Sequence, residues 1–263
     1  MRRVVLCADD FGQDPSVDAG ILELAALGRL GAVSCLSLAP SFAADLPALL
    51  SQRCDVGLHL SLTEGHGAAP DVPLPVLLAR CWARRVGAAE VESRLGAQLD
   101  AFERAASRAP SFVDGHQHVH QFPVVRDALL RVLRRRYGPR LPLVRCTVPR
   151  NHRGLKAAAI AALGGRALRR RLLREGLPHN RDFAGVYGLG PGADYPALMR
   201  AWLAGVGDGG MIVCHPGRPG SADPVAPARV AELRHLASDA FPRDCAAAGV
   251  ALVRLRDLPG GTG

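Results

Sequence analysis

Four titratable side chains at alternating positions are the feature of this sequence that points most directly to chemistry. Residues 111–121 read Ser-Phe-Val-Asp-Gly-His-Gln-His-Val-His-Gln. Side chains two residues apart on an extended strand share a face, so we expect one polar face, formed by Asp114, His116, His118 and His120. Buried imidazoles and carboxylates need partners, which a metal or acid–base site supplies. The competing interpretation is a solvated edge strand rich in histidine.

A single metal ion cannot bind all four side chains of this stretch. Successive positions on one face of a strand lie roughly 6–7 Å apart, which is too far for one coordination sphere to include them all. We therefore expect one or two metal ligands among them, while the others orient those ligands or contact a substrate.

Polar side chains also follow or interrupt other apolar runs. Asp9 and Asp10 come directly after the first run, His59 lies in the third, Arg145 lies in a later one and His215 follows another. Short apolar runs suit the buried strands of a parallel sheet, and in barrel folds the carboxyl ends of such strands gather catalytic groups. Taken singly, each of these residues could instead have a structural role: a helix N-cap for the aspartates, a core histidine at 59 and a turn at 215.

The elements that must position these residues alternate along the chain. We expect strands over 4–8, 32–38, 55–62, 111–121, 143–148, 210–214 and 250–255. Helices are expected over 16–27, 42–50, 90–107, 123–136, 195–206 and 228–248, with a loop over 63–75 and glycine-interrupted helix over 151–181. Alternating strands and helices predict an α/β fold, and 263 residues suit one domain.

Four motifs together resemble one known family. Ala-Asp-Asp-Phe-Gly at 8–12, Gly-Leu-His-Leu at 57–60, Asp-Gly-His-Gln-His-Val-His at 114–120 and Cys-His-Pro-Gly at 214–217 are similar to those of the YdjC-like carbohydrate deacetylases. That family includes chitooligosaccharide and hopanoid-associated deacetylases. The resemblance implies a distorted TIM-like (β/α) barrel, one divalent metal ion, and hydrolysis of the N-acetyl group of an amino sugar.

The resemblance also implies site residues and a domain. The matching positions make Asp10, His59 and His116 the metal ligands, in one YdjC-like domain over residues 1–258. Residues 259–263 are expected to be a disordered tail. The loop at 63–75 and the arginine-rich segment at 151–181 match no pattern of the family, which leaves the identity of the acetylated sugar open.

The chemistry also follows from the residue types. Two imidazoles and a carboxylate leave positions open on a metal ion that acidifies a bound water and polarises an amide carbonyl. Asp9 is the candidate base, which requires an irregular strand end because adjacent strand residues point to opposite faces. His215 is the candidate acid. Arg145 either keeps Asp9 ionised or forms a surface ion pair. The ligand types favour Zn²⁺, and the family is often described with Mg²⁺.

Composition bounds the partners. The formal net charge is +9, and arginines cluster at 131–140 and 166–174. No nucleic-acid motif accompanies them, so we expect solvated helix faces and no nucleic-acid partner, with peripheral contact to an anionic membrane left open. No apolar run reaches the roughly 20 residues that span a bilayer, and the first run is too short for a signal peptide. Seven cysteines without a Cys-x-x-Cys pair favour a reducing, cytoplasmic location.

Three alternative functions compete with deacetylation, and homo-oligomerisation is open. A phosphoesterase with the same ligands would need phosphate-binding groups, for which Gly-Arg-Pro-Gly at 217–220 is a candidate. A non-catalytic carbohydrate-binding relative would not need both Asp9 and His215. A nucleic-acid-binding protein would use the arginine clusters and lose binding steeply with salt.

Overall fold

The computed structural model describes residues 1–66, 69–190 and 192–258, and the predicted tail at 259–263 lies outside these described residues. Its parallel sheet has eight strands in the order β5-β4-β3-β2-β1-β7-β6, with β8 paired to β1. The strands are β1 (Arg2–Phe11), β2 (Ala32–Cys35), β3 (Asp55–Leu60), β4 (Phe112–Gly115), β5 (Leu143–Val144), β6 (Asp182–Ala184), β7 (Gly210–Cys214) and β8 (Val250–Leu252).

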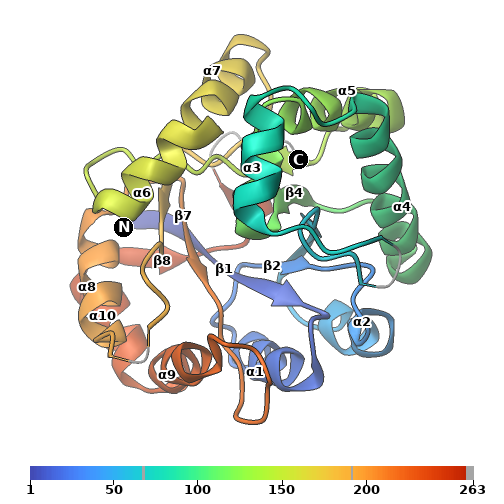
Figure 1. Ribbon diagram of the computed structural model, residues 1–263. Coiled ribbons are helices and arrows are strands. Elements are labelled where there is room, and N and C mark those ends of the chain that lie inside the picture. The colour runs from blue at the N-terminus through green and yellow to red at the C-terminus, as the bar shows by residue number, and fades with distance from the viewer. Residues whose placement is uncertain (67–68, 191, 259–263) are drawn as a thin grey trace.

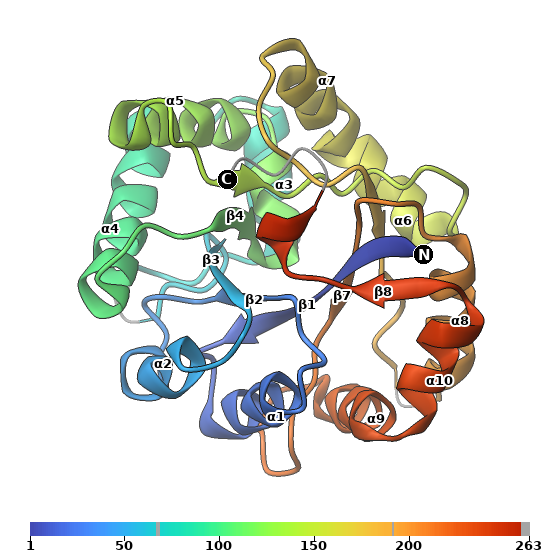
Figure 2. The ribbon, with the colours of Figure 1, turned by 180° about the vertical axis from the view of Figure 1, so that it is seen from behind.

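The sheet curls into an open barrel with helices around its outside (Figures 1 and 2). Within the described residues no ladder joins β5 to β6, so the barrel is a distorted version of the TIM type. The helices are α1 (Pro15–Ala26), α2 (Phe42–Leu50), α3 (Leu74–Trp82), α4 (Ala88–Ala106), α5 (Val125–Tyr137), α6 (Leu155–Ile160), α7 (Arg166–Arg174), α8 (Tyr195–Gly205), α9 (Ala226–Ala237) and α10 (Ala240–Ala247). The predicted α/β fold is confirmed.

Several predicted elements differ from the structure in extent. The helix expected over 228–248 is two helices, α9 and α10, because the chain turns extended at Ser238. The strand expected over 143–148 pairs only at Leu143 and Val144, and β6 and α3 were not expected. These elements are short, and short segments carry too few residues for a periodic pattern to emerge.

The predicted histidine strand is wrong beyond Gly115. Strand β4 ends there, and His116–Gln121 form a 3₁₀ turn, η1, in which Gln117 and His118 have φ angles of 52° and 61°. A half-buried strand needs apolar residues on one face, whereas this stretch alternates its histidines with Gly115, Gln117 and a single valine. The four polar side chains therefore do not share one strand face.

The end of β1 is irregular, as the proposed chemistry required. The register against β2 shifts between Ala8 and Phe11, and Asp10 has a φ angle of 73°. This bulge turns the side chains of Asp9 and Asp10 toward the same region. Neither aspartate caps a helix, because Asp14 is the N-cap of α1 and accepts from the backbone N–H of Ser16 and Val17.

Two further sequence-based expectations can be compared with the described residues. All seven cysteines are free and buried, as small core residues are. None of the helices in the described part of the chain has both the length and the apolar character needed to cross a bilayer.

Candidate active site

A pocket of about 550 Å³ opens at the carboxyl ends of the strands. Strand β1 contributes Asp9 and Asp10 to its lining, β3 contributes His59, η1 contributes His116, and His215 follows β7. Parallel strands end at the same edge of a sheet, so residues far apart in the sequence meet here. The pocket is the place where the sequence motifs converge.

Asp10, His59 and His116 form an open cluster at this pocket. Asp10 Oδ1 lies 2.9 Å from His116 Nδ1 and 3.3 Å from His59 Nε2. One ligand atom from each residue lies within 4.8 Å of the other two. Two imidazoles and a carboxylate at this spacing suit a divalent ion, so the donor set fits the metal that the motifs imply.

The electrostatics of the open cluster favour a cation. Burial opposes protonation of His59, but the negative charges of Asp114 and Asp9 raise its pKa to about 10. Burial likewise opposes protonation of His116, and Asp10 raises the pKa of His116 to about 9. In both cases the carboxylates outweigh the cost of burying charge, so positive charge is stabilised between these side chains.

Buried partners outside the open cluster orient two of its three side chains, His59 and Asp10. His59 Nδ1 donates to Asp114 Oδ1 at 2.6 Å, which leaves Nε2 facing Asp10. Arg229 donates to Asp10 Oδ2 at 2.8 Å, which leaves Oδ1 for the two histidines. Hydrogen bonds of this kind fix the ring orientation and tautomer of metal-binding histidines.

Cys7, Asp9 and Asp114 form a second cluster, closed around Arg145. The guanidinium donates to both oxygens of Asp9 at 2.6 Å and lies 2.5 Å from Asp114 Oδ2 and 3.1 Å from Cys7 Sγ. Arg145 is fully buried, so the alternative of a surface ion pair is wrong. These three residues also have metal-ligand spacing, but the arginine already supplies the cation.

Arg145 determines the charge of Asp9. Burial raises the pKa of Asp9, but the guanidinium outweighs burial and holds that pKa well below its usual range. Asp9 is therefore ionised at neutral pH, next to the open cluster and at the wall of the pocket.

His215 lies at the pocket on a buried hydrogen-bond network. Its backbone N–H donates to Glu232 Oε2 at 2.6 Å, and its ring Nδ1 lies 4.0 Å from Glu232 Oε1. Tyr187 donates its hydroxyl proton to the same carboxylate at 2.6 Å. The glutamate, carried by α9, fixes the backbone from which the imidazole faces the pocket.

The remaining two histidines of the triple separate. His118 lines the pocket and packs edge-on against Phe183, with ring centroids 5.7 Å apart. His120 is fully buried, and its Nε2 donates to the Arg145 backbone oxygen at 3.0 Å. Burial lowers the pKa of His120 to about 4, so this ring is neutral and supports the closed cluster rather than contacting the pocket.

Several pocket residues were not identified from the sequence. Glu64, in the loop after β3, lies 3.3 Å from His116 Nε2, and Lys156 on α6 donates to the Tyr187 backbone oxygen at 2.6 Å. The sequence held a usable signal for each of these two. Glu64 is a polar residue just beyond a predicted strand, and Lys156 is a lone lysine among arginines. Arg229, Glu232 and Tyr187 had none, because they lie outside every motif.

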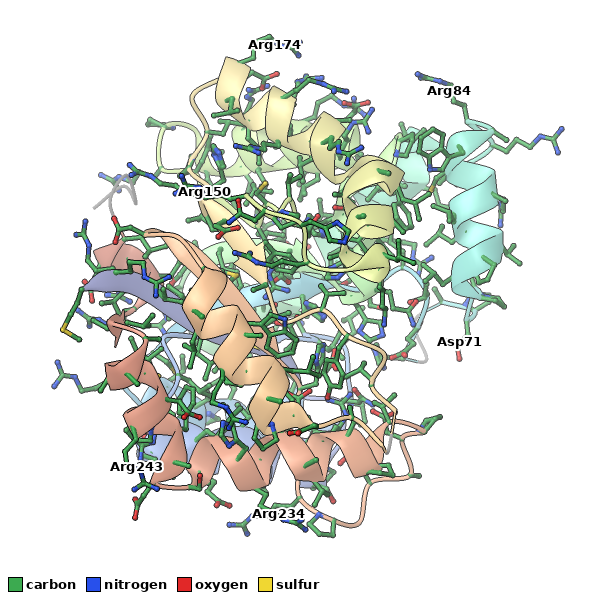
Figure 3. The ribbon with its side chains drawn as sticks, turned by 90° about the vertical axis from the view of Figure 1, so that its left-hand side faces the viewer. Asp71, Arg84, Arg150, Arg174, Arg234 and Arg243 are labelled. Carbon is green, nitrogen blue, oxygen red and sulfur yellow. The ribbon has the colours of Figure 1, made fainter. Side chains whose placement is uncertain are left out.

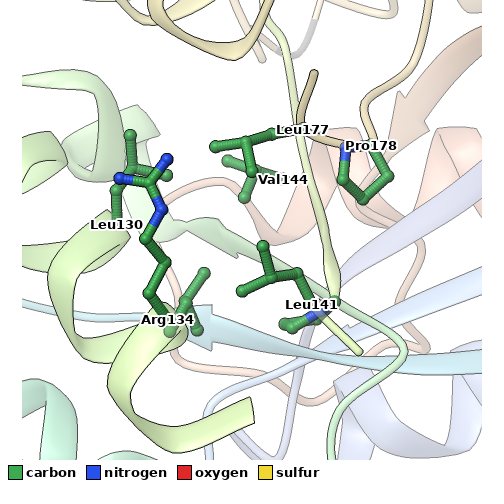
Figure 4. A pocket seen from close by; sticks show the side chains of 8 residues that line it. Leu130, Arg134, Leu141, Val144, Leu177 and Pro178 are labelled. Carbon is green, nitrogen blue, oxygen red and sulfur yellow. The ribbon is translucent and has the colours of Figure 1, made fainter. Parts of the chain in front are cut away.

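A second hollow has no room for a ligand. It lies between α5 and β5, where Figure 4 shows Leu130, Leu141 and Val144 around the stem of Arg134. Its volume is about 10 Å³, close to the space that one water molecule needs.

Comparisons with known proteins identify a family for this chain. A family model described as YdjC-like protein matches residues 3–247. A carbohydrate deacetylase of Homo sapiens is 36% identical over 162 residues, covering 54% of this chain and 49% of that protein. One of Geobacillus stearothermophilus is 35% identical over 161 residues, covering 58% and 63%. The chain spans about half the length of the first curated relatives it matches.

The fold has a similar solved structure. A putative cellobiose-phosphate cleavage protein of Enterococcus faecalis superposes with a TM-score of 0.71, covering 97% of this chain and 98% of that one. At 19% sequence identity, this similarity concerns the fold alone.

Proposed function

Because the chain belongs to the YdjC-like family, we propose that it is a metal-dependent hydrolase that removes the N-acetyl group from an N-acetylated amino sugar. The observation that carries the proposal is the open cluster of Asp10, His59 and His116 at the pocket, with Asp9 and His215 beside it. The curated relatives named carbohydrate deacetylase support the same substrate class.

The open cluster is the proposed site of one divalent ion, Zn²⁺ or Mg²⁺. Asp10 Oδ1, His59 Nε2 and a ring nitrogen of His116 are the proposed ligands, and two imidazoles favour Zn²⁺. When bound, such an ion acidifies a coordinated water and polarises the amide carbonyl.

Asp9 is the proposed base. It is ionised, lies at the pocket wall, and belongs to the bulged strand that also carries Asp10. Two hydrogen bonds from Arg145 fix its plane, so its orientation is set before a substrate enters. The other carboxylate near the cluster, Glu64, contacts His116 and is half-exposed, which makes it the natural comparison for Asp9.

His215 is the proposed acid that protonates the departing amine. Its imidazole faces the pocket from the end of β7, and Glu232 holds its backbone. An amine is a poor leaving group without a proton, so a positioned imidazole is the expected donor.

One alternative loses the candidate residue that the sequence offered for it. Phosphoesterase chemistry would need a phosphate-binding group, and Arg218 was the candidate. Arg218 instead pairs with Glu23 at 2.8 Å, is 55% exposed and does not line the pocket. The sequence motif at 217–220 therefore gives the phosphoesterase hypothesis no structural support.

Acetate release from a panel of N-acetylated sugars, with and without a chelator, tests the proposal. We expect metal-dependent release that falls by roughly 10²–10⁴-fold in Asp9→Asn, with metal content unchanged. Glu64→Gln should lose much less. His215→Ala should mainly lower kcat, and less so for a substrate with a better leaving group. Chelator-resistant activity, or full activity in both Asp9→Asn and His215→Ala, would contradict the mechanism.

We also propose one catalytic domain over residues 1–258 and a cytoplasmic location. Seven free cysteines suit a reducing compartment. Cell fractionation tests the location, and limited proteolysis tests the domain.

A further inference from the structure

Exposed apolar side chains gather on two segments that flank the pocket. Five of the seven large hydrophobic residues exposed in the described chain lie there, the other two being Met1 and Leu27. They are Val76 and Trp82 on α3, Leu155 on α6, Leu163 in the π-turn η2 (Ala161–Gly165), and Leu173 on α7. The same segments contribute Leu74, Lys156 and Ile160 to the pocket lining.

The same two segments carry arginines without acidic partners. Within the described residues, no carboxylate lies within 4.0 Å of any of the following side chains: Arg80, Arg84, Arg85, Arg166, Arg169 and Arg170. By contrast, the arginines of α5 are bound to acidic groups, for example Arg131 to Glu92 at 2.9 Å and Arg136 to Glu103 at 2.6 Å. The basic charge of α5 is therefore largely neutralised. On α7 only Arg171 and Arg174 pair with carboxylates, so three of its five arginines, and those at 80–85, keep an uncompensated charge within the described residues.

These two segments form one side of the molecule. Figure 3 shows Arg84 beyond α3 and Arg174 at the end of α7 both extending outward at the same end of the molecule. We define the rim surface as residues 74–85 together with 155–174. Leu155, with 85% of its surface exposed, Leu173, with 59%, and Trp82, with 53%, are its most exposed apolar residues.

We propose that the rim surface docks onto an anionic membrane surface. Exposed leucines and a tryptophan enter the headgroup boundary, while unpaired arginines attract acidic lipids. A second copy of this chain is a poorer match, because two rim surfaces would bring like charges together. Nucleic acid would satisfy the arginines but leave the leucines in water.

The docking surface is separate from the proposed chemistry. Within the described residues, none of its unpaired arginines forms an ion pair with Asp9, Asp10, His59, His116 or His215, so docking does not depend on the reaction. Because its segments line the pocket, docking would hold the pocket mouth near the lipid–water boundary.

Co-sedimentation with vesicles tests the proposal. The full chain should sediment with vesicles of equal parts phosphatidylglycerol and phosphatidylcholine, bind phosphatidylcholine alone weakly, and lose binding as salt rises. Trp82 provides a second signal, because the other tryptophan, Trp202, is buried. We expect a blue shift of its fluorescence on binding, which is absent in Trp82→Phe.

Two charge-reversal variants form a matched pair. Arg84→Glu with Arg170→Glu should lower partitioning more than about 20-fold, since each arginine near such a surface is worth roughly fivefold. Arg234→Glu with Arg243→Glu carries the same charge change on α9 and α10, at the opposite end in Figure 3, and should lower it far less. Trp82→Ser with Leu155→Ser should reduce binding by about tenfold.

Circular dichroism melts identify any variant that fails to fold. The fluorescence shift of Trp82 in the unchanged chain tests the docking proposal independently of these variants. Absence of sedimentation with the anionic vesicles at low salt would overturn the proposal. So would equal losses in the two charge-reversal variants. A concentration-dependent dimer that the Arg84 and Arg170 changes dissociate would assign the rim surface to a second copy instead.

Discussion

Two groups of three potential metal ligands lie next to each other in this molecule, and they differ in what occupies their centre. Cys7, Asp9 and Asp114 surround the guanidinium of Arg145, which is fully buried. Asp10, His59 and His116 border the pocket, and Arg229 pairs with the outer oxygen of Asp10, Oδ2, while Oδ1 faces the two histidines. The spacing of the potential ligands is alike, so the distinction between a structural cluster and a metal site depends on ligand type and on whether a guanidinium already occupies the centre.

One carboxylate joins the two clusters. Asp114 accepts from His59 Nδ1 through Oδ1 and pairs with Arg145 through Oδ2, at 2.6 and 2.5 Å. The closed cluster therefore fixes the acceptor that orients a histidine of the open one. Four predictions test this division, from the largest expected effect to the smallest.

Removing the guanidinium should be the most damaging change. Arg145→Met leaves the buried carboxylates of Asp9 and Asp114 without a countercharge, so the free energy of unfolding should fall by about 3–5 kcal/mol. Urea denaturation measures it. The control is Arg135→Met, because the ion pair of Arg135 with Glu92 is exposed. Removing that pair should lower the free energy of unfolding by less than about 1 kcal/mol. Equal effects would mean that the closed cluster is not a structural unit.

Removing a proposed ligand should affect metal binding more than stability. His116→Ala should lower metal affinity by more than about 100-fold, because even partners of metal ligands are worth roughly 10–100-fold. His118→Ala, in the same turn but against Phe183, should leave it nearly unchanged. Metal content after dialysis, measured by atomic emission, compares them. Similar losses in both would remove His116 from the ligand set.

Acid should destabilise the closed cluster through His120. Burial lowers the pKa of this ring to about 4, below the roughly 6.5 of the unfolded chain, so the folded state favours the neutral form. The stability associated with the neutral His120 ring is fully present above pH ~6.5 and is lost as pH falls toward ~4. Over this interval the free energy of unfolding should fall by up to about 1.4 kcal/mol per pH unit.

The variant His120→Gln keeps a donor for the Arg145 backbone oxygen and cannot titrate. Its plot of unfolding free energy against pH should be flatter than that of the wild type over this interval. Parallel plots would show that His120 is not held neutral by burial.

The smallest effect is expected at Glu64. This carboxylate lies 3.3 Å from His116 Nε2, but 38% of its side chain is exposed, so water can replace much of the interaction. Glu64→Gln should weaken metal binding by about tenfold, the lower end of the range for such partners. Glu90→Gln on the outer helix α4 is the matched control, and titration calorimetry is the measurement. A loss as large as that of His116→Ala would make Glu64 a ligand.

The polar residues at the carboxyl ends of the strands, which line the pocket, could be predicted from the sequence. Continuous apolar runs identified β1, β3 and β7, and the polar residues at their ends meet because parallel strands share one carboxyl edge. The irregular end of β1 was predictable from chemistry, since Asp9 and Asp10 cannot otherwise serve one site. The turn η1 was missed because alternating polar residues imitate the period of a strand.

The partners of these residues were not predictable. Arg229 and Glu232 lie on α9, more than 200 residues beyond Asp10, and reach the site only because the barrel brings α9 beside α1. Charged residues on an amphipathic helix look the same whether they face water or a buried carboxylate. Only the closed tertiary structure distinguishes the two cases.

The position of Lys156 has a practical consequence. It is the single lysine of the chain, it lines the pocket, and its Nζ donates to the Tyr187 backbone oxygen. Apart from an α-amino group, an amine-selective reagent therefore has one target. Reductive methylation with ¹³C-formaldehyde would place an isotopic probe at the pocket and give a side-chain resonance without assignment of the whole spectrum. A saccharide entering the pocket should shift that signal, so occupancy could be followed without a turnover assay.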